Sequence, residues 1–168
     1  MTRRKRKYLS ESTAKTVIEN NNAVIYYRVS SKEQDIEGYS IAAQRNLLID
    51  YARKNNLNII EEFEDVESAK NSGRKNFSNM LEYIKNNKNI KYVLVEKPDR
   101  LSRNFNDIVR VDEIVNSSNV EFHLVKYNQI YSKNSKSNEK FIFGIHVLQA
   151  KMYIENLAEE TRKGLNQK

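Results

Sequence analysis

The run AVIYYRV, residues 23–29, is apolar apart from Arg28 near its carboxyl end. An uninterrupted apolar run of this length is typical of a strand that is covered on both faces, as in a parallel sheet. Ser30 and Ser31 follow at once. Taken alone, this ending is better explained by a surface arginine and a helix cap than by a nucleophile, so the rest of the chain must decide between them.

Apolar segments with strand and helix periodicity alternate after this run. We predict strands at residues 23–29, 57–63, 90–96 and 120–127, and helices at residues 41–55, 76–87 and 104–117. Ser40 is placed to cap the first helix. The alternation predicts an α/β fold with a mostly parallel central sheet of four or five strands and helices on both faces.

The two ends of the chain differ from this core, which we place at residues 23–138. Residues 1–22 are polar, and the basic run at residues 3–7 supplies five charges of the net +7. This run is either a disordered extension or a contact to nucleic acid. Residues 128–140 are expected to be a long polar loop that leads into the last segment.

The last segment, residues 139–168, is expected to form one long helix from Glu139 to about Lys163. Such a helix of about 25 residues spans roughly 37 Å, longer than a compact core of this size needs. It either packs against another chain or covers its own core. The polar ending without a stop signal leads us to expect a larger protein that is cut here at a domain boundary.

Composition excludes several classes of chemistry. The 168 residues contain no cysteine, which excludes disulfides, thiol catalysis and cysteine-ligated zinc. No apolar run approaches the ~18 residues of a membrane helix. The two histidines, His123 and His146, lie in apolar surroundings and are expected to be structural. No phosphate-binding glycine loop is present, and we expect neither a metal nor a cofactor.

Polar side chains follow three successive predicted strands, where sites form in open α/β sheets. They are Arg28, Ser30 and Gln34; Ser68, Asn71 and Arg74; and Asp99, Arg100, Ser102 and Arg103. Four converging arginines would repel one another unless an anion lay among them, and the guanidinium fork matches a phosphate. Arg100 and Arg103 are expected on one face of a helical turn. The pattern therefore predicts a phosphate site with a serine placed to attack phosphorus.

Five stretches carry a resemblance to a known family: YYRVSSKEQ (26–34), EGYSIAAQ (37–44), DVESAKNSGRKNFSNML (65–81), KPDRLSRN (97–104) and ENLAEETRKGL (155–165). Over residues 23–165 the chain resembles the N-terminal catalytic domain of the serine recombinases, the resolvase/invertase superfamily. It looks most like the large members, the serine-type phage integrases and transposases. This likeness implies that the long last helix is an interface helix leading to DNA-binding domains that are absent from this chain. The chain departs from the family pattern at Ala69, Lys75 and Glu160.

The resemblance implies a site-specific DNA recombinase that needs no ATP. Its implied site comprises Ser30, Arg28, Arg74, Arg100, Arg103, Asp99, Ser68, Gln34 and Gln44. Ser30 would form a 5′-phosphoserine link to DNA, and the arginines would stabilise the transition state. Asp99 would either orient an arginine or transfer a proton, and the base for Ser30 stays open.

The resemblance also implies the partners and the setting. These are double-stranded DNA, a homodimer that assembles into a synaptic tetramer, no membrane and no small-molecule cofactor. The setting is the cytoplasm of a bacterium, with the gene carried by the bacterium, a phage or another mobile element. Two alternatives remain from the residues alone: a regulatory phosphate- or nucleotide-binding domain without covalent chemistry, and an assembly domain that uses the long helix.

Overall fold

The structure, a computed structural model, describes residues 20–30, 41–67, 74–102 and 105–166. The predicted cap Ser40 and nearly all of the predicted N-terminal extension lie outside these ranges. Within them, no helix is long and apolar enough to cross a bilayer.

One mixed sheet forms the centre of the molecule. Its strands are β1 (Asn22–Ser30), β2 (Asn58–Glu67), β3 (Tyr92–Val95), β4 (Glu121–Leu124) and β5 (Gln129–Tyr131). They lie in the order β2-β1-β3-β4-β5, and only the β4–β5 pair is antiparallel. The prediction of a mostly parallel sheet of four or five strands is therefore confirmed.

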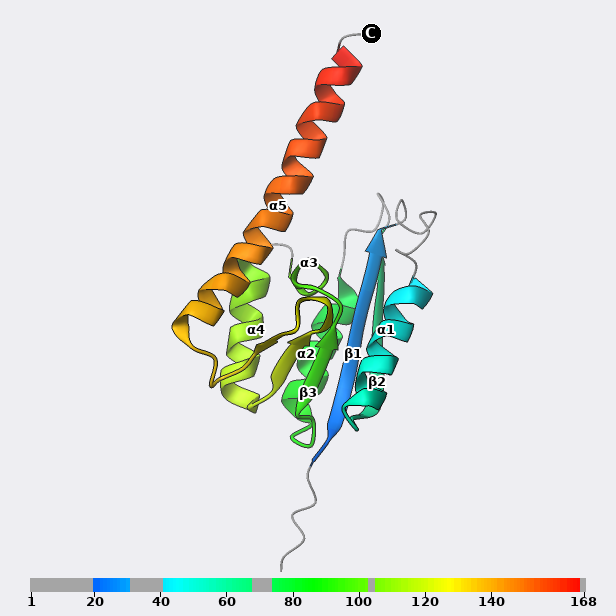
Figure 1. Ribbon diagram of the computed structural model, residues 1–168, viewed down its shortest axis with the longest axis vertical. Coiled ribbons are helices and arrows are strands. Elements are labelled where there is room, and N and C mark those ends of the chain that lie inside the picture. Colours follow the sequence, from blue (N-terminus) through cyan, green and yellow to red (C-terminus); the bar gives the residue numbers. More distant parts are fainter. Residues whose placement is uncertain (1–19, 31–40, 68–73, 103–104, 167–168) are drawn as a thin grey trace, which may run out of the picture.

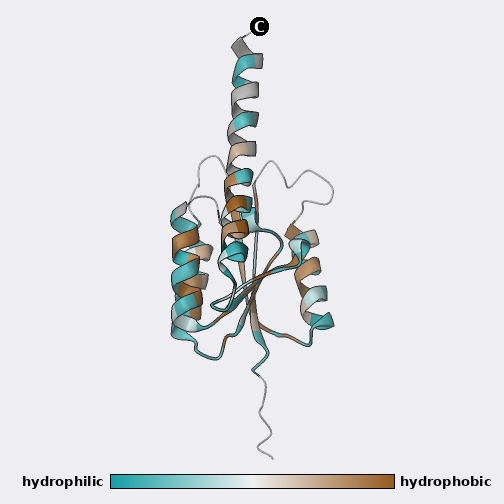
Figure 2. Ribbon diagram, turned by 60° about the vertical axis from the view of Figure 1, so that its left-hand side comes forward, coloured by the Kyte–Doolittle hydropathy of each residue, from teal (hydrophilic) through white to brown (hydrophobic). Residues whose placement is uncertain are grey.

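Helices cover both faces of this sheet, as predicted (Figures 1 and 2). They are α1 (Ile41–Lys54), α2 (Lys75–Asn86), the short α3 (Pro98–Leu101), α4 (Phe105–Ser118) and α5 (Ser137–Asn166). Leu48 and Ala52 of α1 pack against one face, whereas α2, α4 and Phe143 of α5 belong to the larger cluster on the other face. Burial on both faces explains why the β1 sequence is continuously apolar.

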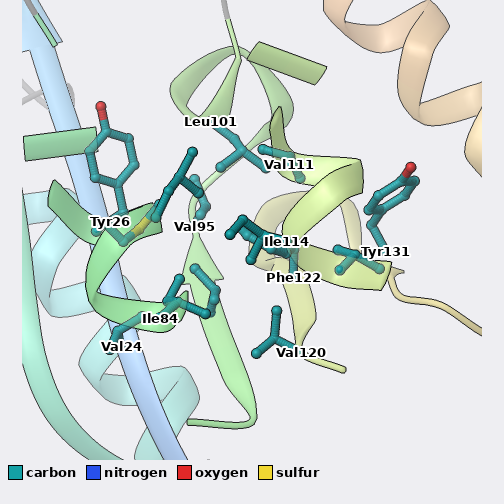
Figure 3. Packing of buried hydrophobic residues seen from close by; sticks show 14 of the residues in the cluster. Val24, Tyr26, Ile84, Val95, Leu101, Val111, Ile114, Val120, Phe122 and Tyr131 are labelled. Carbon is teal, nitrogen blue, oxygen red and sulfur yellow. The ribbon is translucent and has the colours of Figure 1, made fainter. Parts of the chain in front are cut away.

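The larger cluster follows the helical periodicity of α2. Phe77, Met80, Leu81 and Ile84 are all buried, as their spacing of three and four predicts. They meet side chains from β1, β3, β4 and α4 (Figure 3). This packing fixes α2 and α4 beside the carboxyl ends of the strands and so positions the segments that carry the candidate site.

The strand order creates a switch point between β1 and β3. The chain leaves β1 for β2 on one side and then returns to β3 on the other side of β1. In open α/β sheets, ligands bind at the carboxyl ends of the strands at such a point. Ser30 is the last residue of β1, and α3 with Asp99 and Arg100 follows β3 directly.

The prediction of one polar loop over residues 128–140 is wrong. Gln129–Tyr131 forms β5 and pairs antiparallel with β4. The helix α5 begins at Ser137 rather than at Glu139. A strand of three residues with one buried side chain leaves too short a pattern for sequence periodicity to reveal.

The long helix α5 extends past the carboxyl end of the sheet (Figure 1). It contains 30 residues and is therefore roughly 45 Å long. Its beginning is docked by Phe143, which is fully buried and stacks on Tyr131 at 4.6 Å between ring centroids. Farther along, Leu148 and Met152 are 53% and 60% exposed.

The buried His123 on the α1 face gives folding a dependence on pH. Its Nδ1 lies 3.0 Å from the Tyr51 hydroxyl, its Nε2 lies 3.6 Å from Glu121, and the Tyr92 ring packs edge-on against it. Burial lowers the pKa of His123, and this effect exceeds the opposite one of Glu121. The unfolded chain, with a His pKa of about 6.5, then binds the proton more readily than the folded one.

We therefore expect the free energy of unfolding to fall as the pH drops from 7 through about 6.5 and below. The measurement is urea denaturation at successive pH values. The loss should be smaller in His123→Gln than in the wild type over the same pH range. An identical pH profile for the two proteins would contradict this assignment.

Candidate active site

The arginine at the end of β1 binds the backbone of the segment that follows β3. The Arg28 side chain donates through Nε to the carbonyl oxygen of Arg100 at 3.2 Å and through Nη2 to that of Asp99. Arg28 itself is buried. Because the guanidinium fork is rigid, two bonds to neighbouring carbonyl groups fix both the side chain and the turn that it contacts.

The arginine before α2 reaches the same turn from the other side. Arg74 donates through Nη2 to the carbonyl oxygens of Arg100, at 3.1 Å, and Leu101, at 2.7 Å. Its Nη1 forms an ion pair of 2.6 Å with Asp107 of α4. The guanidinium carbon lies 4.0 Å from the centre of the Phe77 ring. The Arg74 side chain is only 8% exposed, so this guanidinium is held within protein rather than presented to solvent.

Arg100 of α3 is also buried and lies among carboxylates. Its Nε is 3.5 Å from Glu96 Oε2 and 3.9 Å from Asp99 Oδ2. Glu96 is shared with Lys126, which pairs with its other oxygen, and Lys97 lies 3.4 Å from Asp99. Cations and carboxylates therefore alternate along this part of the strand edge. The contacts of Arg100 with Glu96 and Asp99 are local to this turn, and Lys97 is the residue at the cap position of α3.

Gln44 supports the end of β1 from the α1 side. Its Nε2 donates to the carbonyl oxygen of Arg28 at 3.0 Å, and the residue is 1% exposed. The contact holds the backbone two residues before Ser30. The structure therefore places Gln44 behind the strand end, where it orders the backbone.

A tyrosine and an aspartate complete a buried network that sequence reasoning missed. The Tyr26 hydroxyl donates to Asp65 Oδ2 at 3.0 Å and accepts from Arg74 Nη2 at 3.0 Å. Asp65 also accepts from the backbone N–H groups of Asn76 and Phe77, at 3.1 and 2.9 Å. It thus caps α2 from a neighbouring strand, since Arg74 at the cap position makes no side-chain cap.

The pKa of Tyr26 is raised to about 12, because burial, with a smaller contribution from Asp65, outweighs the opposing effect of Arg74. The hydroxyl therefore keeps its proton at neutral pH. The sequence gives a partial signal for this network, at Tyr26 and Asp65. A tyrosine inside a buried strand needs a partner for its hydroxyl, and an acid inside a strand needs one for its charge. Nothing in the sequence identifies Asp107 as the partner of Arg74.

Apart from Gln44, the predicted site residues fall into two main groups. Arg28, Arg74, Arg100 and Asp99 come together at the carboxyl ends of β1 and β3, as predicted. Gln34, Ser68, Asn71 and Arg103, together with the side chain of Ser30, lie outside what the structure describes.

The helical turn expected to carry Arg100 and Arg103 is described only as far as Ser102, and Arg103 lies outside the described residues. The helix α3 ends at Leu101, and Ser102 is extended, with φ −134° and ψ 141°. The helical turn that carries Arg100 therefore ends before Ser102.

The departure at position 75 leaves the fold intact. Lys75 is the first residue of α2 and is exposed. Proline is favoured at this position because the first N–H of a helix has no partner within the helix, and lysine is tolerated there for the same reason.

The chemistry of the site suits an anion. Among the described residues, no three His, Cys, Asp or Glu side chains form a group that would hold a metal ion. The guanidinium groups instead bind carbonyl and carboxylate oxygens. A phosphate offers the same kind of acceptor with a greater charge.

Comparison with known proteins agrees with this geometry. The family described as Resolvase, N terminal domain, matches residues 23–168. A resolvase family site-specific recombinase from Streptococcus pneumoniae is 30% identical with a TM-score of 0.59, covering 87% of this chain and 96% of that one. The N-terminal catalytic domain of TP901-1 integrase is 26% identical with a TM-score of 0.60, covering 82% of this chain and 98% of that one.

A third solved structure supports the fold alone. The C-terminal catalytic domain of ISC1926 TnpA, an IS607-like serine recombinase, is 24% identical with a TM-score of 0.51, covering 74% of this chain and 78% of that one. No curated protein matches the chain in sequence. The family match nevertheless spans nearly the whole chain and includes every strand, helix and arginine described above. The chain therefore belongs to the resolvase N-terminal domain family, the serine recombinases, whose members break and rejoin DNA in site-specific recombination.

Proposed function

We propose that this chain is the catalytic domain of a recombinase in which Ser30 is the nucleophile. The observation that carries the proposal is the convergence of Arg28, Arg74 and Arg100 at the β1–β3 switch point, with Ser30 ending β1. Family membership favours this function over a regulatory phosphate-binding domain and over a pure assembly domain.

The reaction begins with attack of the Ser30 oxygen on the phosphorus of a DNA phosphodiester. The bond between phosphorus and the 3′ oxygen breaks as the serine ester forms. The serine proton leaves, and the 3′ oxygen gains a proton to become a hydroxyl. Rejoining reverses these steps, so the energy of the phosphodiester is retained in the serine ester and ATP is not required.

The arginines stabilise the charge that develops on the phosphate. Arg100 on α3 exchanges carboxylate partners for phosphate oxygens, Arg103 joins it, and Arg28 adds its positive charge from the tip of β1. Asp99 orients Arg100 or passes a proton to the leaving oxygen. Gln34 and Ser68 supply supporting hydrogen bonds. Double-stranded DNA is the substrate, and the reaction takes place in the cytoplasm of a bacterium that carries the element.

Trapping of the covalent intermediate tests this function. Nicked duplexes with a randomised centre release a short fragment after cleavage, so rejoining is blocked. DNA that remains attached to protein after denaturation is then recovered and sequenced. We expect an adduct from the wild-type chain, and its complete absence at saturating DNA would contradict the proposed function.

The exposed side of α5 supports a symmetric dimer. Phe141, Ile145, Leu148 and Met152 follow one another at intervals of four, three and four, the spacing of a helix that packs against another helix. The ribbon of the lower part of this helix includes turns coloured as hydrophobic in Figure 2. We propose that a second copy of this chain covers them and that two dimers form the synaptic tetramer.

The double variant Leu148→Glu/Met152→Glu should weaken self-association by about a hundredfold, because charges would enter an apolar interface. Sedimentation equilibrium measures the effect. Gln149→Glu adds one charge at an exposed polar position of the same helix and serves as the control. Equal association of the wild type and the double variant would exclude this surface.

A further inference from the structure

We infer that Tyr26 and Asp107 are positioning residues that fix the orientation of Arg74 and, through it, hold α3 in place at the active site. This inference rests on the proposed function. It concerns two side chains to which the chemistry above gives no role. The first lies inside β1 and the second on α4.

The Tyr26 hydroxyl has no hydrogen-bonding capacity to spare. Arginine only donates, so the hydroxyl oxygen accepts from both Arg74 Nε, at 3.2 Å, and Arg74 Nη2, at 3.0 Å. The single hydroxyl proton then goes to Asp65 at 3.0 Å. The one donor and the two acceptor positions of the Tyr26 hydroxyl are thus all occupied. This arrangement fixes the orientation of the Arg74 guanidinium plane. In Figure 3 the Tyr26 ring belongs to the core cluster, and its oxygen points away from the other labelled side chains.

Asp107 holds the other end of the same guanidinium. Its Oδ2 pairs with Arg74 Nη1 at 2.6 Å, and the residue is buried. The Arg74 plane is therefore held at Nε and Nη2 by β1 and at Nη1 by α4. Arg74 Nη2 also donates to the carbonyl oxygens of Arg100 and Leu101.

Arg74 and Arg28 hold one turn between them. Both donate to the carbonyl oxygen of Arg100, at 3.1 Å and 3.2 Å respectively. A change in the tilt of Arg74 would move this carbonyl and with it the side chains of Asp99 and Arg100, which the same turn carries. Arg74 therefore acts on the reaction through the placement of α3. A displacement of about 1 Å at an active site is enough to slow a reaction severely.

A direct contact between Arg74 and the DNA phosphate is the competing explanation. It requires the guanidinium to leave Asp107 and Tyr26. Under that explanation, weakening either bond should release Arg74 and leave cleavage unchanged or faster. Under positioning, weakening either bond should slow cleavage. The two explanations thus predict changes of opposite sign in the same variants.

The experiment measures adduct formation on a nicked duplex recovered from the trapping assay, at saturating DNA, for the full chain. Tyr26→Phe keeps the ring and removes the hydroxyl, and Asp107→Asn keeps the shape and removes the charge. Each should reduce the rate constant by about tenfold to a hundredfold. Tyr27→Phe is the matched control, because it removes a hydroxyl bond to Glu62 on the opposite face of the same strand. Its rate should equal that of the wild type.

The Kd for DNA and its salt dependence distinguish three explanations of a slower rate. These are a positioning role of Tyr26 and Asp107, a direct contact between Arg74 and the phosphate, and a general loss of structure. Both variants should keep the wild-type Kd within about twofold and the same slope of log Kd against log salt, because no phosphate contact is lost. Should Tyr26→Phe fail to fold, Asp107→Asn carries the test, and faster hydrogen exchange in α3 reports the same displacement.

The outcomes of this experiment test the proposed function and the positioning role separately. No adduct with the wild type contradicts the proposed function itself. A wild-type adduct together with unchanged or faster rates in Tyr26→Phe and Asp107→Asn overturns the positioning role alone. A changed salt slope in these variants also overturns it, in favour of a phosphate contact.

Discussion

The Ser30→Ala variant should form no covalent adduct with nicked DNA, a loss of about 10⁴-fold or more in rate. The reason is chemical: the methyl group of alanine has no oxygen to bond to phosphorus, and a neighbouring water would cleave DNA without attaching it to protein. Binding should be retained, because the arginines that meet the phosphate are unchanged. The measurement is the trapping assay at saturating DNA, with Kd determined in parallel.

Ser31→Ala is the matched control for this prediction, since it removes the adjacent hydroxyl. It should form the adduct at nearly the wild-type rate. Digestion of the wild-type adduct and mass spectrometry should locate the nucleotide on the peptide that contains Ser30. Adduct formation by Ser30→Ala at the wild-type rate would place the nucleophile elsewhere.

The second large effect concerns folding. The Asp65→Ala variant should lose about 3–5 kcal/mol of unfolding free energy. The substitution removes the acceptor for two backbone N–H groups at the start of α2 and for the hydroxyl of Tyr26. It also removes a buried negative charge next to the Tyr26–Arg74 pair, so donors are left without acceptors in the core.

Urea denaturation measures this loss as a lower midpoint with an unchanged slope. Asp65→Asn should lie between the wild type and the alanine variant, because an asparagine oxygen accepts one of the backbone bonds. Glu64→Ala changes the preceding, exposed acid and should alter the free energy by no more than about 0.5 kcal/mol. A loss below about 1 kcal/mol in Asp65→Ala would show that the network contributes little to stability.

Much of the fold is predictable because it depends on local periodicity. The apolar face of α2 and the continuous apolar run of β1 each reflect burial that is repeated over many residues. The strand β5 is not predictable in this way. It pairs through backbone groups over three residues, and its polar sequence context resembles a loop.

The sequence predicts which residues gather at the strand ends, but it does not predict their hydrogen-bond and ion-pair partners. That Arg28 and Arg100 come together follows from parallel strands whose carboxyl ends share one edge. Their partners do not follow, because a backbone carbonyl is present at every residue and carries no sequence signal. The pairing of Arg74 with Asp107 joins the residue before α2 to a residue of α4, and periodicity within one helix cannot reveal such a pair.

The contacts of Arg28 and Arg74 with backbone oxygens of α3 have a consequence for how this region tolerates change. Replacement of the side chains at positions 99 and 100 leaves these acceptors in place, so alanine substitutions at these two positions would not detect this backbone attachment of the turn. The side chains of Asp99 and Arg100 can therefore take part in the chemistry while the turn remains docked. Only a change in the main chain itself, such as an ester in place of the peptide bond that follows Arg100, would weaken the acceptor that both arginines share.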